Sequence, residues 1–268
     1  MERIPNLKIC YDRVIPMKYN SAEFKLNQMR EDALLKHTGA KSVREAFSDL
    51  DSSKSVPPSH MALINAKAWP KGASLKCRFL DGSSVQQNKV IQKAKIWENY
   101  ANIHLDFVTT TDEQVRISFQ ADDGSWSAIG QDALDKDYFP KDQPTMNFGW
   151  LKDDTDDQEY ERVVVHEFGH ALGCIHEHQS PTEHLQWNKE AVYAQFSGPP
   201  NNWTKEEIDQ NILEKYSKNG TTETLFDKAS IMLYQFPAEL FLNHVGTPLN
   251  THLSTKDEKF IAQMYPKF

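Results

Sequence analysis

The stretch that decides the fold reads His166-Glu167-Phe168-Gly169-His170-Ala171-Leu172-Gly173-Cys174-Ile175-His176, with the spacing H-E-x-x-H-x-x-G-x-x-H. Residues four apart lie on the same face of a helix, so His166 and His170 can direct their imidazoles to one point. Gly173 can adopt a left-handed conformation, which would end the helix and turn the chain back. This turn would bring His176 to the same point as the other two histidines.

Three neutral imidazoles suit zinc and leave one position of a tetrahedral ion open. An open position is typical of a catalytic zinc site, whereas a structural site has four protein ligands. A water molecule there would lose its proton near neutral pH, and a carboxylate beside it could accept that proton. Glu167 is the candidate for this general base. The stretch therefore predicts one catalytic Zn²⁺ ion held by His166, His170 and His176.

A second motif follows downstream and reads Ser230-Ile231-Met232-Leu233-Tyr234. Metzincin peptidases combine the extended histidine motif with a downstream methionine turn. The serine two residues before the methionine and the tyrosine two residues after it resemble the astacin-like branch of this class. The resemblance implies that Met232 forms an apolar floor beneath the histidines. It also implies that Tyr234 either ligates zinc or stabilises the oxyanion.

Three further segments resemble the astacin-like family, so the resemblance covers about residues 65–268. Residues 123–130 resemble the segment that precedes the substrate-binding edge strand. His176-Glu177-His178 matches a common continuation in which the glutamate supports the mature amino terminus, although residues 179–181 lack the arginine and aspartates of animal astacins. Residues 253–266 are similar to the C-terminal helix of many metzincins. The pattern resembles a microbial or fungal astacin-like peptidase more than an animal one.

The hydrophobic pattern of the chain is compatible with the metzincin fold that the resemblance implies. The pattern predicts strands at 75–80, 103–108 and 115–120, together with helices at 86–100 and 159–172. We therefore expect an α+β protein with a zincin-like fold, in which a twisted mixed sheet carries the active-site helix. The N-terminal subdomain would span residues 61–176, and a mostly helical or irregular C-terminal subdomain would span 177–268.

Residues 145–150 stand where the family has its edge strand, just before the zinc helix. An edge strand has free backbone donors and acceptors, and an extended peptide can pair with it. We therefore expect Asn147, Phe148 and Gly149 to bind substrate. The alternative is that this segment is an ordinary buried strand.

The first 60 residues form an N-terminal extension with two interpretations. Helical spacing at 21–37, a capping-box pattern at Ser42 and Glu45, and a serine- and proline-rich linker at 51–59 predict a small helical layer. Metzincins, however, are often held latent by a pro-segment that offers a cysteine or aspartate to zinc. Cys10 is the only thiol placed to do so. A lone cysteine is more often a small buried hydrophobe, so the helical layer is preferred over a cysteine switch.

Composition limits the partners and the compartment. The 268 residues carry a net charge of −8, which argues against nucleic acid or an anionic membrane as the main partner. No apolar run is long enough to span a bilayer, and the amino terminus has no signal-peptide pattern. We therefore expect either secretion, after loss of a leader or by a leaderless route, or a cytoplasmic protein. Oligomeric state is left open, with a monomer favoured.

Several cysteines and histidines lie outside the predicted ligand set. The three cysteines are widely spaced and odd in number, which does not indicate a disulfide framework, and Cys174 is expected to be a small buried thiol. His178 and His184 are expected to be solvated loop residues. His104 is expected to face outward from a strand.

Two functional classes remain from the sequence. The first is a zinc endopeptidase acting on peptide or protein substrates. Its rival is a zinc-containing, non-proteolytic peptide-binding module or a latent zymogen. Retention of Glu167 favours the peptidase, because a purely structural site needs no base and would favour a fourth protein ligand.

Overall fold

The structure is a computed structural model that describes residues 11–13, 63–198, 201–216, 221–222 and 225–267. These residues belong to one compact unit, which comprises Met1–Arg13 and Ser59–Phe268, while Val14–Pro58 forms a second unit. The helices predicted near residues 21–37 and 42–45, the linker at 51–59 and Cys10 lie outside the described residues.

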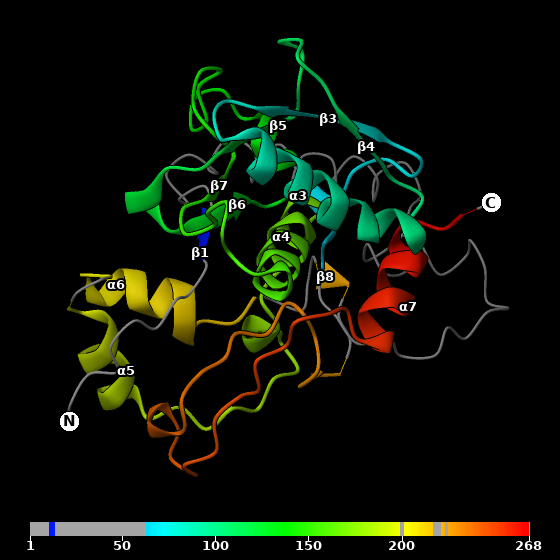
Figure 1. Cartoon of the computed structure of the whole chain (residues 1–268). Coiled ribbons are helices and arrows are strands. Elements are labelled where there is room, and N and C mark those ends of the chain that lie inside the picture. Colours follow the sequence, from blue (N-terminus) through cyan, green and yellow to red (C-terminus); the bar gives the residue numbers. More distant parts are fainter. Residues whose placement is uncertain (1–10, 14–62, 199–200, 217–220, 223–224, 268) are drawn as a thin grey trace, which may run out of the picture. The chain divides into compact units, whose positions relative to one another are not determined.

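A six-stranded mixed sheet forms the upper layer of the described unit in Figure 1, with the strand order β1-β6-β7-β5-β3-β4. Its strands are β1 (Tyr11–Arg13), β3 (Ser74–Phe79), β4 (His104–Phe107), β5 (Val115–Ser118), β6 (Ser125–Ala128) and β7 (Met146–Phe148). All neighbours are parallel except β6 and β7, which are antiparallel. Alternation in β3 places Leu75 and Cys77 in the core, and the strands predicted at 75–80, 103–108 and 115–120 are confirmed.

The strand predicted as the edge lies inside the sheet. β7 pairs with β5 on one side, where Met146 is opposite Ile117, and with β6 on the other, where Asn147 is opposite Trp126. The Asn147 side chain is buried and donates to the carbonyls of Gln120 and Gly124, 2.9 and 2.6 Å away. The prediction of an edge strand at 145–150 is therefore wrong, because both sides of β7 are already paired.

Two helices pack against each other below the sheet and bury its face (Figure 1). Helix α3 (Ser84–Ala94) begins with a capping box between Ser83 and Gln86 and continues into the 3₁₀ turn η2 (Lys95–Asn99). Helix α4 (Asp157–Ala171) is capped by Asp156, whose side chain accepts from the Glu159 N–H. The indole of Trp97 donates to the Val165 carbonyl, 3.0 Å away, and joins the two helices.

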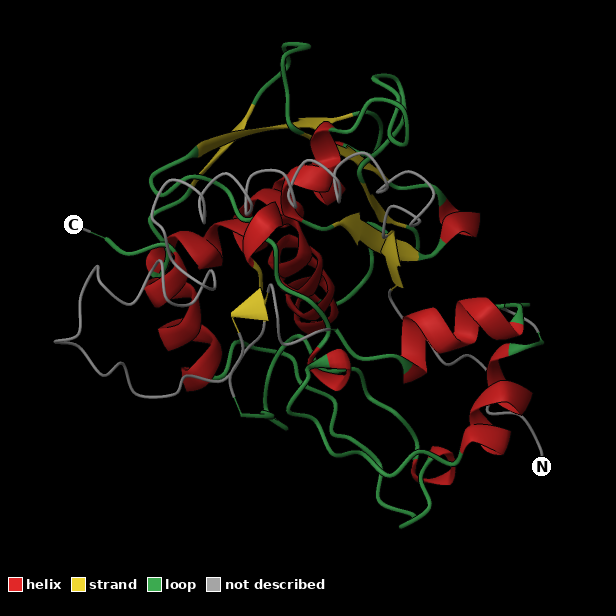
Figure 2. Ribbon diagram, turned by 180° about the vertical axis from the view of Figure 1, so that it is seen from behind, coloured by secondary structure: helices red, strands yellow, loops and turns green. Residues whose placement is uncertain are grey.

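The C-terminal part of the chain consists mostly of loops with short helices (Figure 2). Its helices are α5 (Lys189–Phe196), α6 (Lys205–Ile208), which continues as the π-helical turn η6 (Asp209–Leu213), and α7 (Thr255–Met264). A capping box between Thr204 and Glu207 opens α6. A second hydrophobic core joins α5 and α6 to Phe236 and Phe241.

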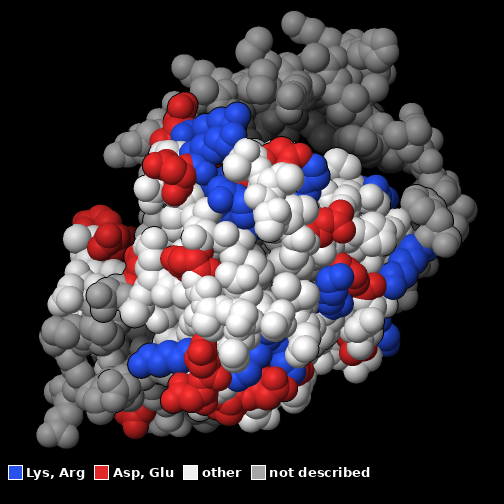
Figure 3. All heavy atoms as spheres, turned by 45° about the horizontal axis from the view of Figure 1, so that its top comes forward, with Lys and Arg blue, Asp and Glu red and all other residues white. Residues whose placement is uncertain are grey.

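Shorter elements complete the unit. β2 (Leu63–Ile64) pairs antiparallel with β8 (Thr221–Thr222). The remaining 3₁₀ turns are η1 (Asn65–Lys67), η3 (Ala121–Asp123), η4 (Gly130–Leu134), η5 (Glu177–Gln179) and η7 (Ala238–Leu240). On the face seen in Figure 3, acidic and basic side chains are interspersed. Within the described ranges, no helix combines the length and apolar character that crossing a membrane requires.

Candidate active site

The end of α4 turns the chain back as the glycine predicted. Gly173 has a φ of 97°, in the left-handed region. The Gly173 N–H donates to the His170 carbonyl, 2.7 Å away, and the Cys174 N–H donates to the Gly169 carbonyl, 3.0 Å away. This pair of bonds is the Schellman motif, which ends a helix at a left-handed residue.

Two side chains from outside the helix hold its last carbonyls in place. The Trp69 indole donates to the Ala171 carbonyl, and the Tyr265 hydroxyl donates to the Leu172 carbonyl, each at 2.7 Å. Carbonyls at a helix C-terminus lack intrahelical partners, so these bonds satisfy groups that burial would otherwise leave unpaired. The helix end is therefore fixed both by local turn geometry and by contacts from distant parts of the chain.

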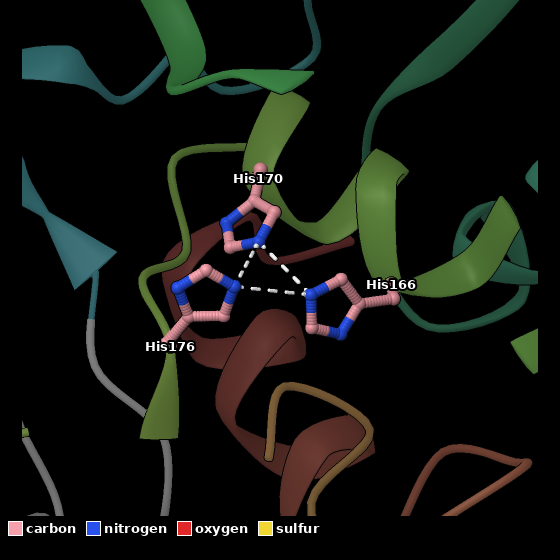
Figure 4. Close-up of side chains that lie close together, drawn as sticks. All are labelled: His166, His170 and His176. Carbon is pink, nitrogen blue, oxygen red and sulfur yellow. Dashed lines mark hydrogen bonds between the residues drawn. The ribbon is translucent and has the colours of Figure 1, made fainter. Parts of the chain in front are cut away.

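His166, His170 and His176, called the histidine triad below, converge on one point (Figure 4). Their Nε2 atoms lie 3.0 to 3.2 Å from one another. Ligand nitrogens of a tetrahedral zinc ion lie about 3.3 Å apart when each Zn–N distance is about 2.0 Å. The donor set and its spacing therefore fit zinc.

Backbone carbonyls orient two of the three rings. His166 Nδ1 donates to the Ile231 carbonyl, 2.8 Å away, and His170 Nδ1 donates to the Cys174 carbonyl, 2.9 Å away. A neutral imidazole carries one N–H, so a proton on Nδ1 leaves a lone pair on Nε2. Such partners fix both the tautomer and the ring orientation of metal-binding histidines.

Burial keeps His166 and His176 in the neutral form that a metal requires. Desolvation lowers the pKa of His176 to about 3, even though a hydrogen bond with Gln179 opposes the shift. Desolvation also lowers the pKa of His166 well below its usual value, and its two triad neighbours add to the effect. Both rings are therefore uncharged at neutral pH, and no proton has to leave before they bind an ion.

The other residues predicted to act at the site lie close to the triad. Glu167 is fully buried and follows His166 in α4. The Tyr234 ring is 5% exposed, and its centroid lies 4.1 Å from the His176 ring and 5.4 Å from the His166 ring. The structure thus brings Tyr234 beside the triad although it is far from it in sequence.

Met232 lies against the active-site helix. It is fully buried, and a Cβ atom placed on Gly169 would meet Met232 Sδ at 2.5 Å. Gly169 stands between the two histidines of the helix, so the absence of a side chain there lets the methionine approach the backbone. This contact places the methionine turn directly against the helix turn that carries His166 and His170.

His178 differs from its prediction. It is 1% exposed, and its Nε2 lies 3.2 Å from the Asn211 carbonyl. Its ring contacts Trp187, Tyr234 and Phe236, with centroids 5.0 to 6.2 Å away. The prediction of a solvated loop residue is wrong, because aromatic side chains from distant segments enclose this part of the chain.

The predictions for the surroundings of His184, His104 and Cys174 are confirmed. His184 and His104 are exposed. Cys174 is buried and free, and desolvation raises the pKa of its thiol well above the usual value, so it stays protonated. Among the described residues, the triad is the only group of three or more histidine, cysteine or acidic side chains placed to hold a metal ion.

Glu177 connects the triad to the methionine turn. It is buried, and its Oε1 accepts from the Asp227 N–H, 2.6 Å away. The Glu177 N–H donates to the Met232 carbonyl at 2.9 Å. Burial raises the pKa of the Glu177 carboxyl well above its usual value.

Comparison with known proteins agrees with this site. The family model described as Astacin, a peptidase family, matches residues 63–264. Two solved structures of myroilysin are similar: one has 40% identity and a TM-score of 0.74, covering 77% of this chain and 99% of that chain. The other has 39% identity and a TM-score of 0.60, covering 75% of this chain and 87% of that one.

A more distant solved structure shares the fold. It is high choriolytic enzyme 1, a hatching-enzyme zinc-protease from the medaka fish Oryzias latipes, with 17% identity and a TM-score of 0.52. The match covers 75% of this chain and 95% of that chain. A search of curated proteins finds no match.

The helix, the triad and the methionine turn together define a metzincin-type zinc peptidase. The chain belongs to the astacin family of peptidases. It is a zinc metalloendopeptidase with an α+β fold, as the sequence predicted, and its substrates are peptides or proteins. The alternative of a non-proteolytic peptide-binding module is not favoured.

Proposed function

We propose that the histidine triad holds the zinc ion and that Glu167 is the general base of peptide-bond hydrolysis. The observation that carries this assignment is the convergence of three Nε2 atoms within 3.2 Å of one another, next to the buried Glu167. Two of these atoms belong to His166 and His170, which lie on the same helix as Glu167. A zinc ion supplies Lewis acidity there, which polarises the scissile carbonyl and lowers the pKa of a water molecule. Zinc content and cleavage of an unfolded protein, measured for wild type and Glu167→Gln, test the assignment.

The chain's own groups carry the proton transfers. The Glu167 carboxylate accepts a proton from the attacking water and then delivers it to the leaving amine. Met232 supports the triad from below, where it packs against Gly169.

Tyr234 donates a hydrogen bond to the oxyanion in this proposal. Its ring lies against two triad histidines, which supports a position next to the scissile carbonyl. Removing one oxyanion donor typically lowers kcat by two to three orders of magnitude. We expect Tyr234→Phe to lower kcat by about 100-fold with little change in KM or zinc content.

Tyr193→Phe is the matched control for Tyr234→Phe. Tyr193 lies on α5, which carries no triad residue, and its hydroxyl donates to Asp209, 2.5 Å away. We expect this variant to cleave an unfolded protein at the wild-type rate. Equal kcat values for Tyr234→Phe and wild type would remove Tyr234 from the reaction.

We propose β6 as the strand that binds substrate, in place of Asn147, Phe148 and Gly149. β6 lies outside β7 and packs against α4, which carries the first two triad histidines. An extended peptide can add to the sheet along the edge of β6 that faces away from β7. The backbone there pairs with β1, where Asp12 is opposite Ser127.

We further propose that residues 1–60 are a pro-segment that restrains the peptidase until it is removed. The pairing of β1 with β6 supports this view, because a strand of the same chain holds the edge that substrate needs. Glu177 supports it too. Within the described residues, its buried Oε2 has no hydrogen-bond partner, so a new amino terminus could pair with it after cleavage.

Removal of the segment is expected to raise activity. A tethered strand acts at an effective concentration on the order of 1 mM, so a strand whose own Kd for the sheet edge is about 0.1 mM should lower cleavage by roughly tenfold. The measurement is the intact mass of the chain during incubation, followed together with its rate of peptide cleavage. Loss of the first residues should accompany the rise in rate.

Asp12→Pro tests the strand pairing without removal of the segment. Proline cannot donate a backbone hydrogen bond and disfavours strand pairing, whereas Asp12→Ala keeps the backbone and is the control. We expect the full-length proline variant to be more active than the alanine variant. A full-length wild-type chain as active as the shortened one would refute the pro-segment.

A further inference from the structure

Asp257 is a buried carboxylate in the first turn of α7, outside the groups assigned to catalysis so far. It is 0% exposed. Its Oδ1 accepts from the Ser230 hydroxyl at 2.8 Å, and its Oδ2 accepts from the Ile231 N–H at 2.8 Å and from the Ser254 N–H at 2.9 Å. Two of these three donors belong to the methionine turn.

Asp257 accepts more hydrogen bonds than the capping box of α7 requires. The Ser254 hydroxyl already accepts from the N–H groups of Lys256 and Asp257, and Asp257 returns one bond to the Ser254 N–H. A buried carboxylate is costly unless donors satisfy it. The donors that satisfy the rest of this one are Ser230 and Ile231, so Asp257 connects α7 to the methionine turn.

The connection continues from the methionine turn to the metal site. Ile231 gives its N–H to Asp257, and its carbonyl accepts from His166 Nδ1 at 2.8 Å. Both backbone groups of one residue are thus fixed, one by the carboxylate and the other by the ring. The Ser230 hydroxyl also accepts from the Met232 N–H at 3.1 Å, so the whole turn is held.

We propose that Asp257 is a positioning residue for His166: by holding Ile231 in place, it sets the orientation and tautomer in which His166 presents Nε2 to the metal. This inference rests on the proposed role of the triad as zinc ligands. Groups that orient a metal-binding histidine from behind typically change metal affinity or activity by 10- to 100-fold when they are lost.

The experiment compares Asp257→Asn with wild type at pH 8. Burial raises the pKa of Asp257 to about 6 although its hydrogen bonds lower it, so the side chain is a carboxylate at this pH. Asparagine keeps the size but has one accepting oxygen in place of two, so it cannot accept from the Ser230 hydroxyl and from both backbone N–H groups. We expect the zinc dissociation constant, from chelator competition, to rise by roughly 10- to 100-fold. The visible spectrum of the Co²⁺-substituted protein should shift, and kcat should fall while KM stays unchanged.

Ser254→Ala is the matched control. It removes the hydroxyl cap of α7 and the bond from this hydroxyl to Asp227, but it leaves the bonds from Ser230 and Ile231 to Asp257. We expect it to lower the Tm while zinc affinity and the Co²⁺ spectrum stay as in wild type. Ser230→Ala removes the hydroxyl bond to Asp257 and should weaken zinc binding by a smaller factor than Asp257→Asn does. If Asp257→Asn does not fold, the zinc affinity of Ser230→Ala tests the inference instead.

The outcomes separate this inference from the proposed function. Wild-type zinc affinity and an unchanged Co²⁺ spectrum in the Ser230→Ala variant, and in Asp257→Asn where it folds, would overturn the inference and leave the peptidase assignment intact. A wild-type chain that binds no zinc would overturn both. Weakened zinc binding in these variants, with Ser254→Ala as wild type, supports the positioning role.

Discussion

Glu167→Gln is expected to lower kcat for cleavage of an unfolded protein by about 10²- to 10⁴-fold, the usual contribution of a general base. Glutamine has the size of glutamate but cannot accept and return a proton at neutral pH. Since Glu167 is fully buried beside His166, the substitution should leave the packing and the three imidazoles unchanged. The variant should therefore still bind one zinc ion.

Glu161→Gln is the control for this substitution on the same helix. Glu161 pairs with Lys93 at 3.0 Å and is partly exposed, and it lies on the same helix before the proposed base Glu167. We expect Glu161→Gln to cleave at the wild-type rate. Equal cleavage by wild type and Glu167→Gln, with zinc bound to both, would rule out Glu167 as the base.

His170→Ala is expected to have the second large effect, because it removes one of the three proposed zinc ligands. Zinc affinity should fall by more than the roughly 100-fold that loss of an outer partner can cause, and cleavage should fall with zinc occupancy. A ligand that binds only the folded state stabilises it by about 4 kcal/mol at a free concentration about 1,000 times its Kd. Zinc should therefore raise the Tm of wild type much more than that of His170→Ala.

His104→Ala is the matched control for the loss of a ligand. His104 is exposed at the start of β4, away from the triad, so its removal should leave both the zinc affinity and the zinc-dependent rise in Tm unchanged. A His170→Ala variant that kept wild-type zinc affinity would show that the metal is held elsewhere.

The metal site could be predicted from the sequence because its geometry is mostly local. Helical periodicity places His166 beside His170, and a single left-handed glycine, Gly173, turns the chain so that His176 returns. The histidine motif together with the downstream methionine turn then predicted that Met232 and Tyr234 belong to the site. The structure places both of them against the triad or the helix that carries it.

The order of the strands could not be predicted in the same way. β6 and β7 are both fully buried, so neither shows the alternation that would mark an exposed edge. Which of the two lies outside depends on pairing between residues far apart in the chain, and hydrophobic pattern does not encode that pairing. The family resemblance placed the edge strand at β7, which is one strand too late in the sequence.

The burial and the hydrogen-bond partners of single polar residues could not be predicted from the sequence either. His178 is buried because Trp187 and Phe236 pack around it from the C-terminal part of the chain. Asp257 stands in a plain capping pattern after Ser254, and only the fold brings the methionine turn to its carboxylate. The spacing Ser254-x-x-Asp257 was the one local signal that this carboxylate accepts backbone hydrogen bonds.

The most direct test of the central claim is a zinc titration of the metal-free wild-type protein, with cleavage of an unfolded protein as the signal. It is measured on the full chain and again after its amino-terminal residues have been removed. We predict that cleavage rises in proportion to added zinc and stops rising at one ion per chain. Cleavage that is already complete without zinc, or one bound zinc per chain with no cleavage in either form, would contradict the assignment.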